Sequence, residues 1–116
     1  MAYIPAQGDV IWIDFDPQAG YEQAGHEQAG RRPALVLSRM SYNQRASLVV
    51  LCPLTRQVKG YIFEVLVPPG HPVVGAVLAD QVKNMDWTVR DTKYICTLPI
   101  VIVEQVVKKT VALIGP

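Results

Sequence analysis

The chain has 116 residues, of which 50% are hydrophobic and 18% charged, and its formal net charge is +1 at neutral pH. This length and composition suit one domain with its own core, residues 1–116, and exclude an intrinsically disordered chain. A net charge so close to zero gives, by itself, no argument for a polyanionic partner.

Short segments with alternating or β-branched patterns predict strands along the whole chain. They are residues 9–15, 34–38, 48–52 and 61–67, with shorter candidates at 76–79 and 93–97. Both faces of the first segment are largely apolar, so we expect a well-buried strand with Trp12 in the core. Short strands separated by turn residues predict a mainly β fold, a small antiparallel barrel or curled sheet.

A repeat lies between the first two predicted strands, with the sequence QAGYE-QAGHE-QAGRR over residues 18–32. A five-residue period is far too short for a repeat architecture, and its glycines and low apolar content predict a surface loop. Duplication of one pentapeptide within an existing loop is the simplest origin.

The C-terminal stretch has apolar residues at helical i, i+3, i+4 spacing from Val103 to Ile114. Leu98-Pro99 suits the start of a helix and Gly115-Pro116 its end. The many β-branched residues oppose a helix by propensity. Periodicity and length favour the helix.

The two cysteines, Cys52 and Cys96, lie far apart, without a CxxC pair or a Cys/His cluster. This spacing suggests neither a zinc site nor a disulfide framework, and the apolar surroundings predict buried thiols. The first residues lack the pattern of a signal peptide, and no apolar run is long enough to span a bilayer. We therefore expect a cytoplasmic protein that does not enter a membrane.

Charge is segregated along the chain. Residues 1–30 contain five acidic residues and no lysine or arginine, whereas residues 31–63 contain six basic residues and no acidic one. This pattern is compatible with a local phosphate-binding surface. Strand pairing could equally mix the two blocks in space, so charge alone leaves both interpretations open.

Arg32 and Thr55 each stand at an end of a predicted strand, which would hold their side chains in place. Suppose that the substrate is RNA and that no metal takes part. Cleavage then needs a base for the 2′-hydroxyl, donors for the charged phosphate and an acid for the leaving oxygen. The planar guanidinium of arginine suits the phosphate, and a threonine hydroxyl can donate to it. Glu27 is a candidate base, or a partner that orients the arginine. On chemistry alone, ordinary structural roles for all three remain open.

Five blocks of the sequence, in order, resemble the MazF/PemK toxins. They are GDV at 8–10, DFDP at 14–17, EQAGRRPALVLS at 27–38, CPLTRQ at 52–57 and LADQVK at 78–83. The resemblance covers nearly the whole chain. It places Arg32 on the catalytic arginine of the family and Thr55 on its catalytic threonine, with no gap between them, and Glu27 on a loop glutamate of many members.

Several properties are implied by the resemblance alone. It implies an SH3-like barrel of the CcdB–PemK type with a C-terminal helix, and a homodimer. It implies the toxin of a type II toxin–antitoxin system, a sequence-specific endoribonuclease that needs no metal or cofactor. Such enzymes cut single-stranded mRNA, leaving 2′,3′-cyclic phosphate and 5′-hydroxyl ends. The implied partner is an antitoxin whose disordered acidic tail covers the RNA groove.

The division of roles within the site follows from acidity. The pKa of arginine is above about 12, which makes it a poor base at neutral pH. We expect Arg32 to stabilise phosphate charge and to protonate the leaving oxygen, while Glu27 or a water takes the 2′-proton.

Further residues are candidates for RNA contacts, through phosphates, base edges or stacking. They are Arg31, Phe15, Pro17, Asn43, Gln57, Lys59, Gln81 and Lys83. For Phe15, packing in the core is at least as good an interpretation. Trp87 suits packing or a dimer interface better than stacking.

Two other functions compete with the ribonuclease. One is a non-catalytic toxin of similar fold, like CcdB, which would bind DNA gyrase, and the other is a barrel that serves only as an interaction module. Retention of both Arg32 and Thr55 argues against a pure binder.

Overall fold

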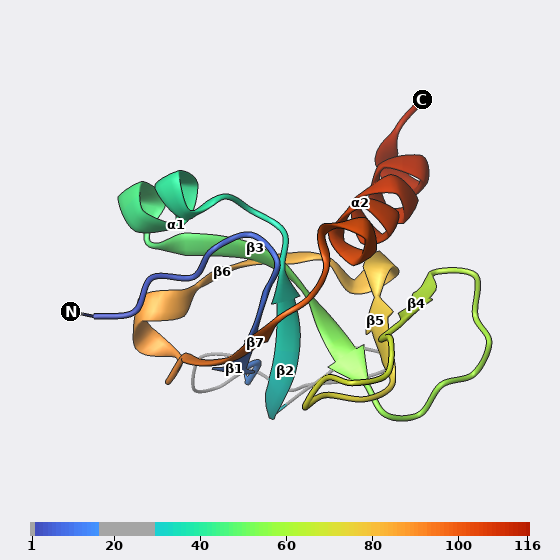
Figure 1. Ribbon diagram of the computed structural model, residues 1–116. Helices are drawn as coiled ribbons and strands as arrows, with labels where there is room; N and C mark the ends of the chain where they lie inside the picture. The colour runs from blue at the N-terminus through green and yellow to red at the C-terminus, as the bar shows by residue number, and fades with distance from the viewer. Residues whose placement is uncertain (1, 17–29) are drawn as a thin grey trace.

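The computed structural model describes residues 2–16 and 30–116, so Pro17, Glu27 and most of the QAG repeat lie outside the described residues. Seven strands form one sheet (Figure 1). They are β1 (Asp9–Asp14), β2 (Arg31–Val36), β3 (Leu48–Thr55), β4 (Glu64–Leu66), β5 (Ala76–Leu78), β6 (Lys83–Asp86) and β7 (Lys93–Thr97). Two α-helices, α1 (Met40–Ala46) and α2 (Ile100–Ile114), and two short 3-10 turns, η1 (Ala79–Gln81) and η2 (Trp87–Val89), complete the described fold.

The strands pair in the order β4-β5-β3-β2-β1-β7, and β6 joins β3 beside this path. All of these pairs are antiparallel. The long strand β3 pairs with β6 over Leu48–Leu51 and with β5 over Leu54–Thr55, so it turns from one part of the sheet into the other. The predicted mainly β fold with a C-terminal helix is confirmed. The described strands curl into a barrel-like sheet that is not closed.

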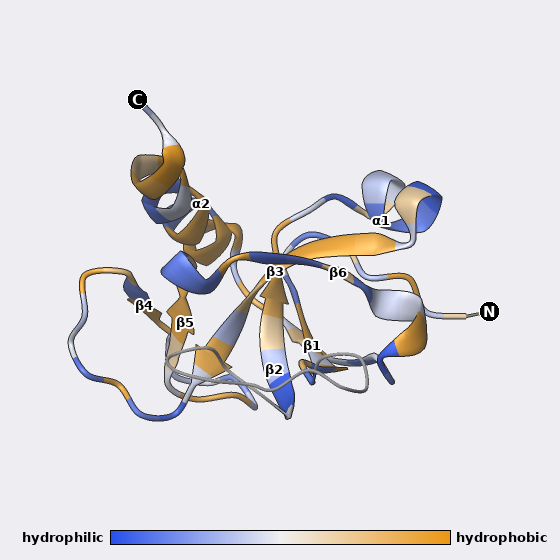
Figure 2. Cartoon of the chain, turned by 180° about the vertical axis from the view of Figure 1, so that it is seen from behind, coloured by the Kyte–Doolittle hydropathy of each residue, from blue (hydrophilic) through white to orange (hydrophobic). Residues whose placement is uncertain are grey.

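Both faces of the central strands are buried, because alternate residues of a strand point to opposite faces. Val10 and Leu35 belong to one core cluster, together with Val103 and Val106 of α2. Ile11, Ile13 and Ala34, with five further residues, form a second cluster on the other face. In Figure 2, hydrophobic colour lies on β3, β5 and much of α2, and hydrophilic colour lies along β6 and at the start of β2.

Helix α2 confirms the predicted C-terminal helix. Its inner face buries Ile102, Val103, Val106 and Thr110 against the sheet. The Thr110 hydroxyl lies 3.0 Å from the carbonyl oxygens of both Ala79 and Val106, so the one polar group on this face is satisfied.

Helix α1 was not predicted, because its sequence MSYNQRA lacks an apolar face. One side chain, Asn43, fixes it to the fold. Asn43 is 0% exposed, and its amide donates to the carbonyls of Pro5 at 2.8 Å and Ser38 at 3.1 Å. Its side-chain oxygen accepts from the Ser38 hydroxyl, and its carbonyl accepts from the Trp87 indole at 2.9 Å. The packing role predicted for Trp87 agrees with this contact.

The ends of the segment that leaves β1 and enters β2 are held together. The Phe15 N–H donates to the Gly30 carbonyl at 2.8 Å, and the Gly30 N–H donates to the Asp16 carboxylate at 2.7 Å. The Arg90 guanidinium donates to the carbonyls of Asp14 and Asp16, both at 3.0 Å. These contacts, which we call the neck, define where β2 starts and therefore where Arg31 and Arg32 stand.

Candidate active site

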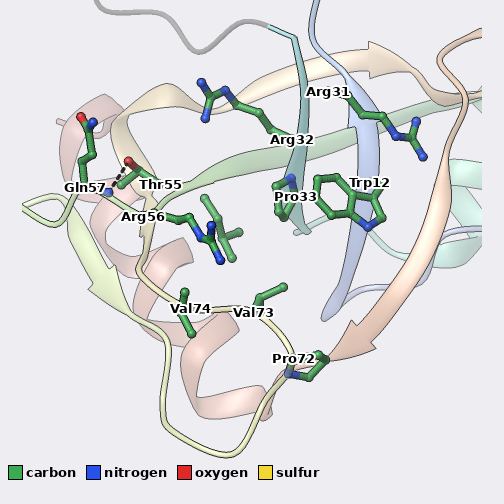
Figure 3. A pocket seen from close by; sticks show the side chains of 11 residues that line it. Trp12, Arg31, Arg32, Pro33, Thr55, Arg56, Gln57, Pro72, Val73 and Val74 are labelled. Atoms are coloured by element: carbon green, nitrogen blue, oxygen red, sulfur yellow. Dashed lines mark hydrogen bonds between the residues drawn. The ribbon is translucent and has the colours of Figure 1, made fainter.

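A pocket of about 570 Å³ opens where β2 begins and β3 ends (Figure 3). Eleven residues line it: Trp12, Arg31, Arg32, Pro33, Leu54, Thr55, Arg56, Gln57, Pro72, Val73 and Val74. The sequence separates these residues into four groups, which strand pairing brings together. Three are arginines, and none of the eleven is acidic. The lining therefore offers cationic donors to an anion such as a phosphodiester.

Arg32 and Thr55 come together through the pairing of β2 with β3. The paired residues Ala34↔Pro53 and Leu35↔Cys52 fix the register of the two strands. Arg32 and Thr55 each lie two residues beyond the last of these pairs, Ala34↔Pro53, where the two strands reach the pocket. Both side chains are partly buried, and both line the pocket. The structure thus brings together the two residues that the sequence placed at its centre.

The Thr55 hydroxyl is oriented by the backbone that follows it. The Gln57 N–H donates to Thr55 Oγ1 at 3.1 Å (Figure 3). Since the oxygen accepts this bond, the hydroxyl proton remains available to donate toward the pocket. An anion in the pocket would accept a hydrogen bond from this hydroxyl.

Thr55 also depends on a close approach by Gly75, which has a φ of +105°. A Cβ atom at residue 75 would lie 1.9 Å from the Thr55 carbonyl oxygen. Only glycine suits this position, both for its left-handed backbone and for the space. Gly75 therefore belongs to the construction of the site, although it offers no side chain to it.

Seven of the eleven lining residues were not predicted as site residues, and Arg56 and Trp12 are the two with functional side chains. Arg56 is exposed and extends into the pocket in Figure 3. Its position next to Thr55 in the basic block was the available signal. Trp12 was predicted to be core, and this is wrong: it is 40% exposed and forms part of the pocket wall. Alternation along β1 places it on the opposite face from its buried neighbours Ile11 and Ile13.

Arg31 lies beside Trp12 at the far side of the pocket from Thr55 in the view of Figure 3. Its guanidinium carbon is 5.8 Å from the centre of the Trp12 ring, within the range of a cation–π contact. The same guanidinium forms an ion pair with Asp91 at 2.9 Å. Arg31 is thus held by a carboxylate and an indole at once.

The remaining predicted site residues divide into four groups. Gln57 lines the pocket, whereas Lys59, Gln81 and Lys83 do not. Phe15 is 2% exposed and Asn43 is 0% exposed. The prediction that these two residues contact RNA is therefore corrected. The side chain of Phe15 packs in the core, and that of Asn43 anchors α1 through hydrogen bonds. Pro17 and Glu27 lie outside the described residues.

A family model described as "PemK-like, MazF-like toxin of type II toxin-antitoxin system" matches residues 6–114. The chain is 46% identical to the endoribonuclease toxin MazF of Escherichia coli K12 over 88 residues, which are 76% of this chain and 74% of the relative. It is 34% identical to the endoribonuclease toxin ChpB of the same strain over 93 residues, covering 77% and 76%.

Solved structures agree with this family match. MazF from Deinococcus radiodurans superposes with a TM-score of 0.90 at 42% identity, covering 99% of this chain and 100% of that one. A MazE–MazF structure from the same organism gives a TM-score of 0.83 at 37% identity, covering 98% of each chain. With a family match along nearly its whole length and this agreement in fold, the chain belongs to the PemK-like, MazF-like toxins of type II toxin–antitoxin systems.

Proposed function

We propose that this chain is the toxin of a type II toxin–antitoxin system and acts as an endoribonuclease whose reaction takes place between Arg32 and Thr55. One observation supports the assignment of the site: β2 and β3 bring a guanidinium and an oriented hydroxyl to one pocket, which three arginines line without any acidic residue. The relatives MazF and ChpB of Escherichia coli are both endoribonucleases by name.

The proposed reaction is an internal displacement at phosphorus. The 2′-oxygen of the RNA attacks, a bond from this oxygen to phosphorus forms, and the bond to the 5′-oxygen breaks. Arg32 and the Thr55 hydroxyl donate to the phosphate oxygens, where negative charge increases in the transition state. Arg32 gives a proton to the leaving 5′-oxygen. The 2′-proton passes to Glu27 or to a water, and the products are a 2′,3′-cyclic phosphate and a 5′-hydroxyl.

Incubating the protein with mixed-sequence single-stranded RNA in the presence of a chelator tests this proposal. Loss of one donor to a developing oxyanion lowers turnover by about 100- to 1000-fold. We expect losses of this size in Arg32→Ala and Thr55→Val, and wild-type cutting in Arg39→Ala, whose exposed arginine lies outside the pocket. End analysis should find cyclic phosphates. Intact RNA together with inhibited DNA gyrase would instead support the CcdB-like alternative.

The identity of the general base, which takes the 2′-proton, is tested separately. Glu27→Gln should slow cleavage strongly and remove the acidic limb of the pH–rate profile, because an amide cannot take the 2′-proton. Unchanged activity of Glu27→Gln across this pH range would leave a water as the base.

The proposed partner in inhibition is a cognate antitoxin whose disordered acidic tail occupies the RNA pocket. MazE–MazF complexes from Deinococcus radiodurans are known. The acid-free, arginine-lined pocket supports an acidic ligand here. A peptide copied from the acidic tail of the antitoxin should inhibit cleavage in competition with RNA, and its inhibition constant should rise with added salt. Inhibition that more RNA does not relieve would contradict a shared pocket.

We also propose that residues 1–116 form one domain that pairs as a homodimer in the cytoplasm. The outer face of α2 supports pairing, because Ile100, Val107, Val111 and Ile114 follow one another along the helix and are 37–72% exposed. Sedimentation should show a dimer that Val111→Glu converts to a monomer. In the described part of the chain, neither helix is suited to crossing a bilayer.

A further inference from the structure

We propose that Trp12, on the wall of the pocket, stacks against one base of the bound RNA and thereby helps to choose which sequence is cut. This inference rests on the proposed ribonuclease function, since it concerns how the same pocket holds its substrate. It adds a contact to a base in a pocket whose proposed catalytic contacts are to the phosphate.

The position of Trp12 is the first observation. Strand β1 lies inside the sheet, between β2 and β7, and its residues Ile11 and Ile13 are 0% exposed. Trp12 between them remains 40% exposed. A large indole left open on a central strand forgoes much of the stabilisation that its burial would bring. A ligand in the pocket would recover that stabilisation.

The second observation is the way in which the indole is held. Trp12 pairs across the strands with Pro33, whose ring allows little movement and which also lines the pocket. Arg31 lies over the indole at 5.8 Å and is tied to Asp91, so its guanidinium approaches Trp12 from a defined side. In the view of Figure 3 this side is away from Arg56 and Thr55. The indole is thus fixed before any ligand arrives.

The third observation is the division of the pocket by polarity. Arg32, Thr55, Arg56 and Gln57 supply donors at one side. Around Trp12 the wall is formed by Pro33, Pro72 and Val73, with Arg31, which is paired with Asp91, beside the indole (Figure 3). A nucleotide has the matching division, a charged phosphate joined to a flat base with two apolar faces. Proteins that bind single-stranded nucleic acid commonly combine cationic grooves with aromatic side chains in this way.

Kinetics with a defined substrate test the subsite. The cut site is first mapped in mixed-sequence RNA, and a short oligonucleotide centred on it is then made with an abasic nucleotide at each position in turn. Stacking contributes about 1–3 kcal/mol per base, which corresponds to roughly 5- to 150-fold in affinity. We expect Trp12→Ala to raise KM by a factor in this range with kcat within about twofold of wild type, and Trp12→Phe to restore most of the loss.

The abasic series separates stacking from a general structural effect. At one position, an abasic nucleotide should raise KM for the wild type about as much as Trp12→Ala does, and should add nothing further in that variant. Penalties that add at every position would overturn the proposal, as would an unchanged KM in Trp12→Ala. Trp87→Phe is the matched control, because its indole bonds to the Asn43 carbonyl and lies outside the pocket lining. It should leave KM unchanged.

A binding measurement keeps the inference testable even if Trp12→Ala fails to fold. In Trp87→Phe, Trp12 is the only remaining tryptophan of the chain. Its fluorescence should change on titration with the same oligonucleotide carrying a 2′-O-methyl group at the cut site, and should not change with the abasic oligonucleotide. Equal responses to both would overturn the subsite. A wild-type protein that binds RNA through Trp12 but never cuts it would refute the proposed function alone.

Discussion

The backbone of Gly75 runs against the carbonyl of Thr55, so closely that a Cβ atom at residue 75 would also lie 2.9 Å from the Thr55 carbonyl carbon. Gly75→Ala must therefore move Thr55, and misplacement of a reacting group by about 1 Å can lower turnover roughly 100-fold. Steady-state cleavage should show this loss in kcat. The control is Gly70→Ala, where φ is +93° but nothing lies within 4 Å of the new Cβ. Gly70→Ala carries a similar backbone strain and should keep the wild-type kcat. Equal losses of kcat in both variants would show that the close approach of Gly75 to Thr55 is not the cause.

Asn43 should govern stability and not RNA binding. Asn43→Ala removes hydrogen bonds from buried or partly buried groups of Pro5 and Ser38, and each group left without a partner costs about 1–3 kcal/mol. Urea unfolding should show a loss of this order, while KM of the folded protein stays unchanged. Gln57→Ala should raise KM and leave the free energy of unfolding unchanged. The exposed Gln57 side chain lines the pocket, and the hydrogen bond to Thr55 uses only the Gln57 backbone. A raised KM in Asn43→Ala, with normal stability, would restore its assignment to the RNA surface.

Cys52 should make the folded state less stable in alkali. Burial raises the pKa of its thiol from 9.0 to about 12, whereas an unfolded chain releases this proton near pH 9. A group with a raised pKa in the folded state contributes stability below its unfolded pKa and loses it as the pH rises toward the folded value. Between pH 9 and 12 the free energy of unfolding should fall by up to about 1.4 kcal/mol per pH unit from this group. Urea unfolding of wild type and Cys52→Ala at pH 8 to 10.5 measures the difference in slope, and parallel curves would contradict it.

Arg90 should position the start of β2 without touching substrate. Arg90→Met removes the donors to the carbonyls of Asp14 and Asp16, so the neck should open more often. Amide hydrogen exchange at Phe15 and Gly30 should become faster, and kcat should fall by roughly tenfold because Arg32 is held less well. Arg45→Met changes an exposed arginine at the end of α1 and should alter neither quantity. Unchanged exchange in Arg90→Met would show that the backbone bond between Phe15 and Gly30 suffices.

Much of the fold was predictable because it follows from local periodicity. Alternation marked β1, and a short run rich in leucine and β-branched residues marked β3. The i, i+3, i+4 spacing marked α2 against its β-branched composition. Helix α1 escaped because a single buried amide, Asn43, anchors it, and no apolar face reveals it. Strand β4 is also shorter than the predicted 61–67, since only Glu64–Leu66 pair with β5.

The site was predictable in its chemistry and less so in its geometry. Resemblance to a family located Arg32 and Thr55, but their juxtaposition depends on the register of β2 against β3, which no local pattern reveals. Trp12 was misjudged for a related reason. Alternation showed two apolar faces on β1, but it could not show that the face with the buried Val10 is left uncovered at Trp12, beside the pocket.

The neck has a consequence for how the toxin can change over generations. The Gly30 N–H bonds to the Asp16 carboxylate, so the sequence between them departs from and returns to points that the fold already holds together. For an ideal chain closed between such points, adding one five-residue unit changes the free energy of closure by only about 0.3 kcal/mol. Slippage in a tandem QAG coding repeat can therefore lengthen or shorten this segment while Arg32 and Thr55 stay in place. A change in the length of the repeat therefore need not move the start of β2, because the neck bonds are made by residues on either side of it.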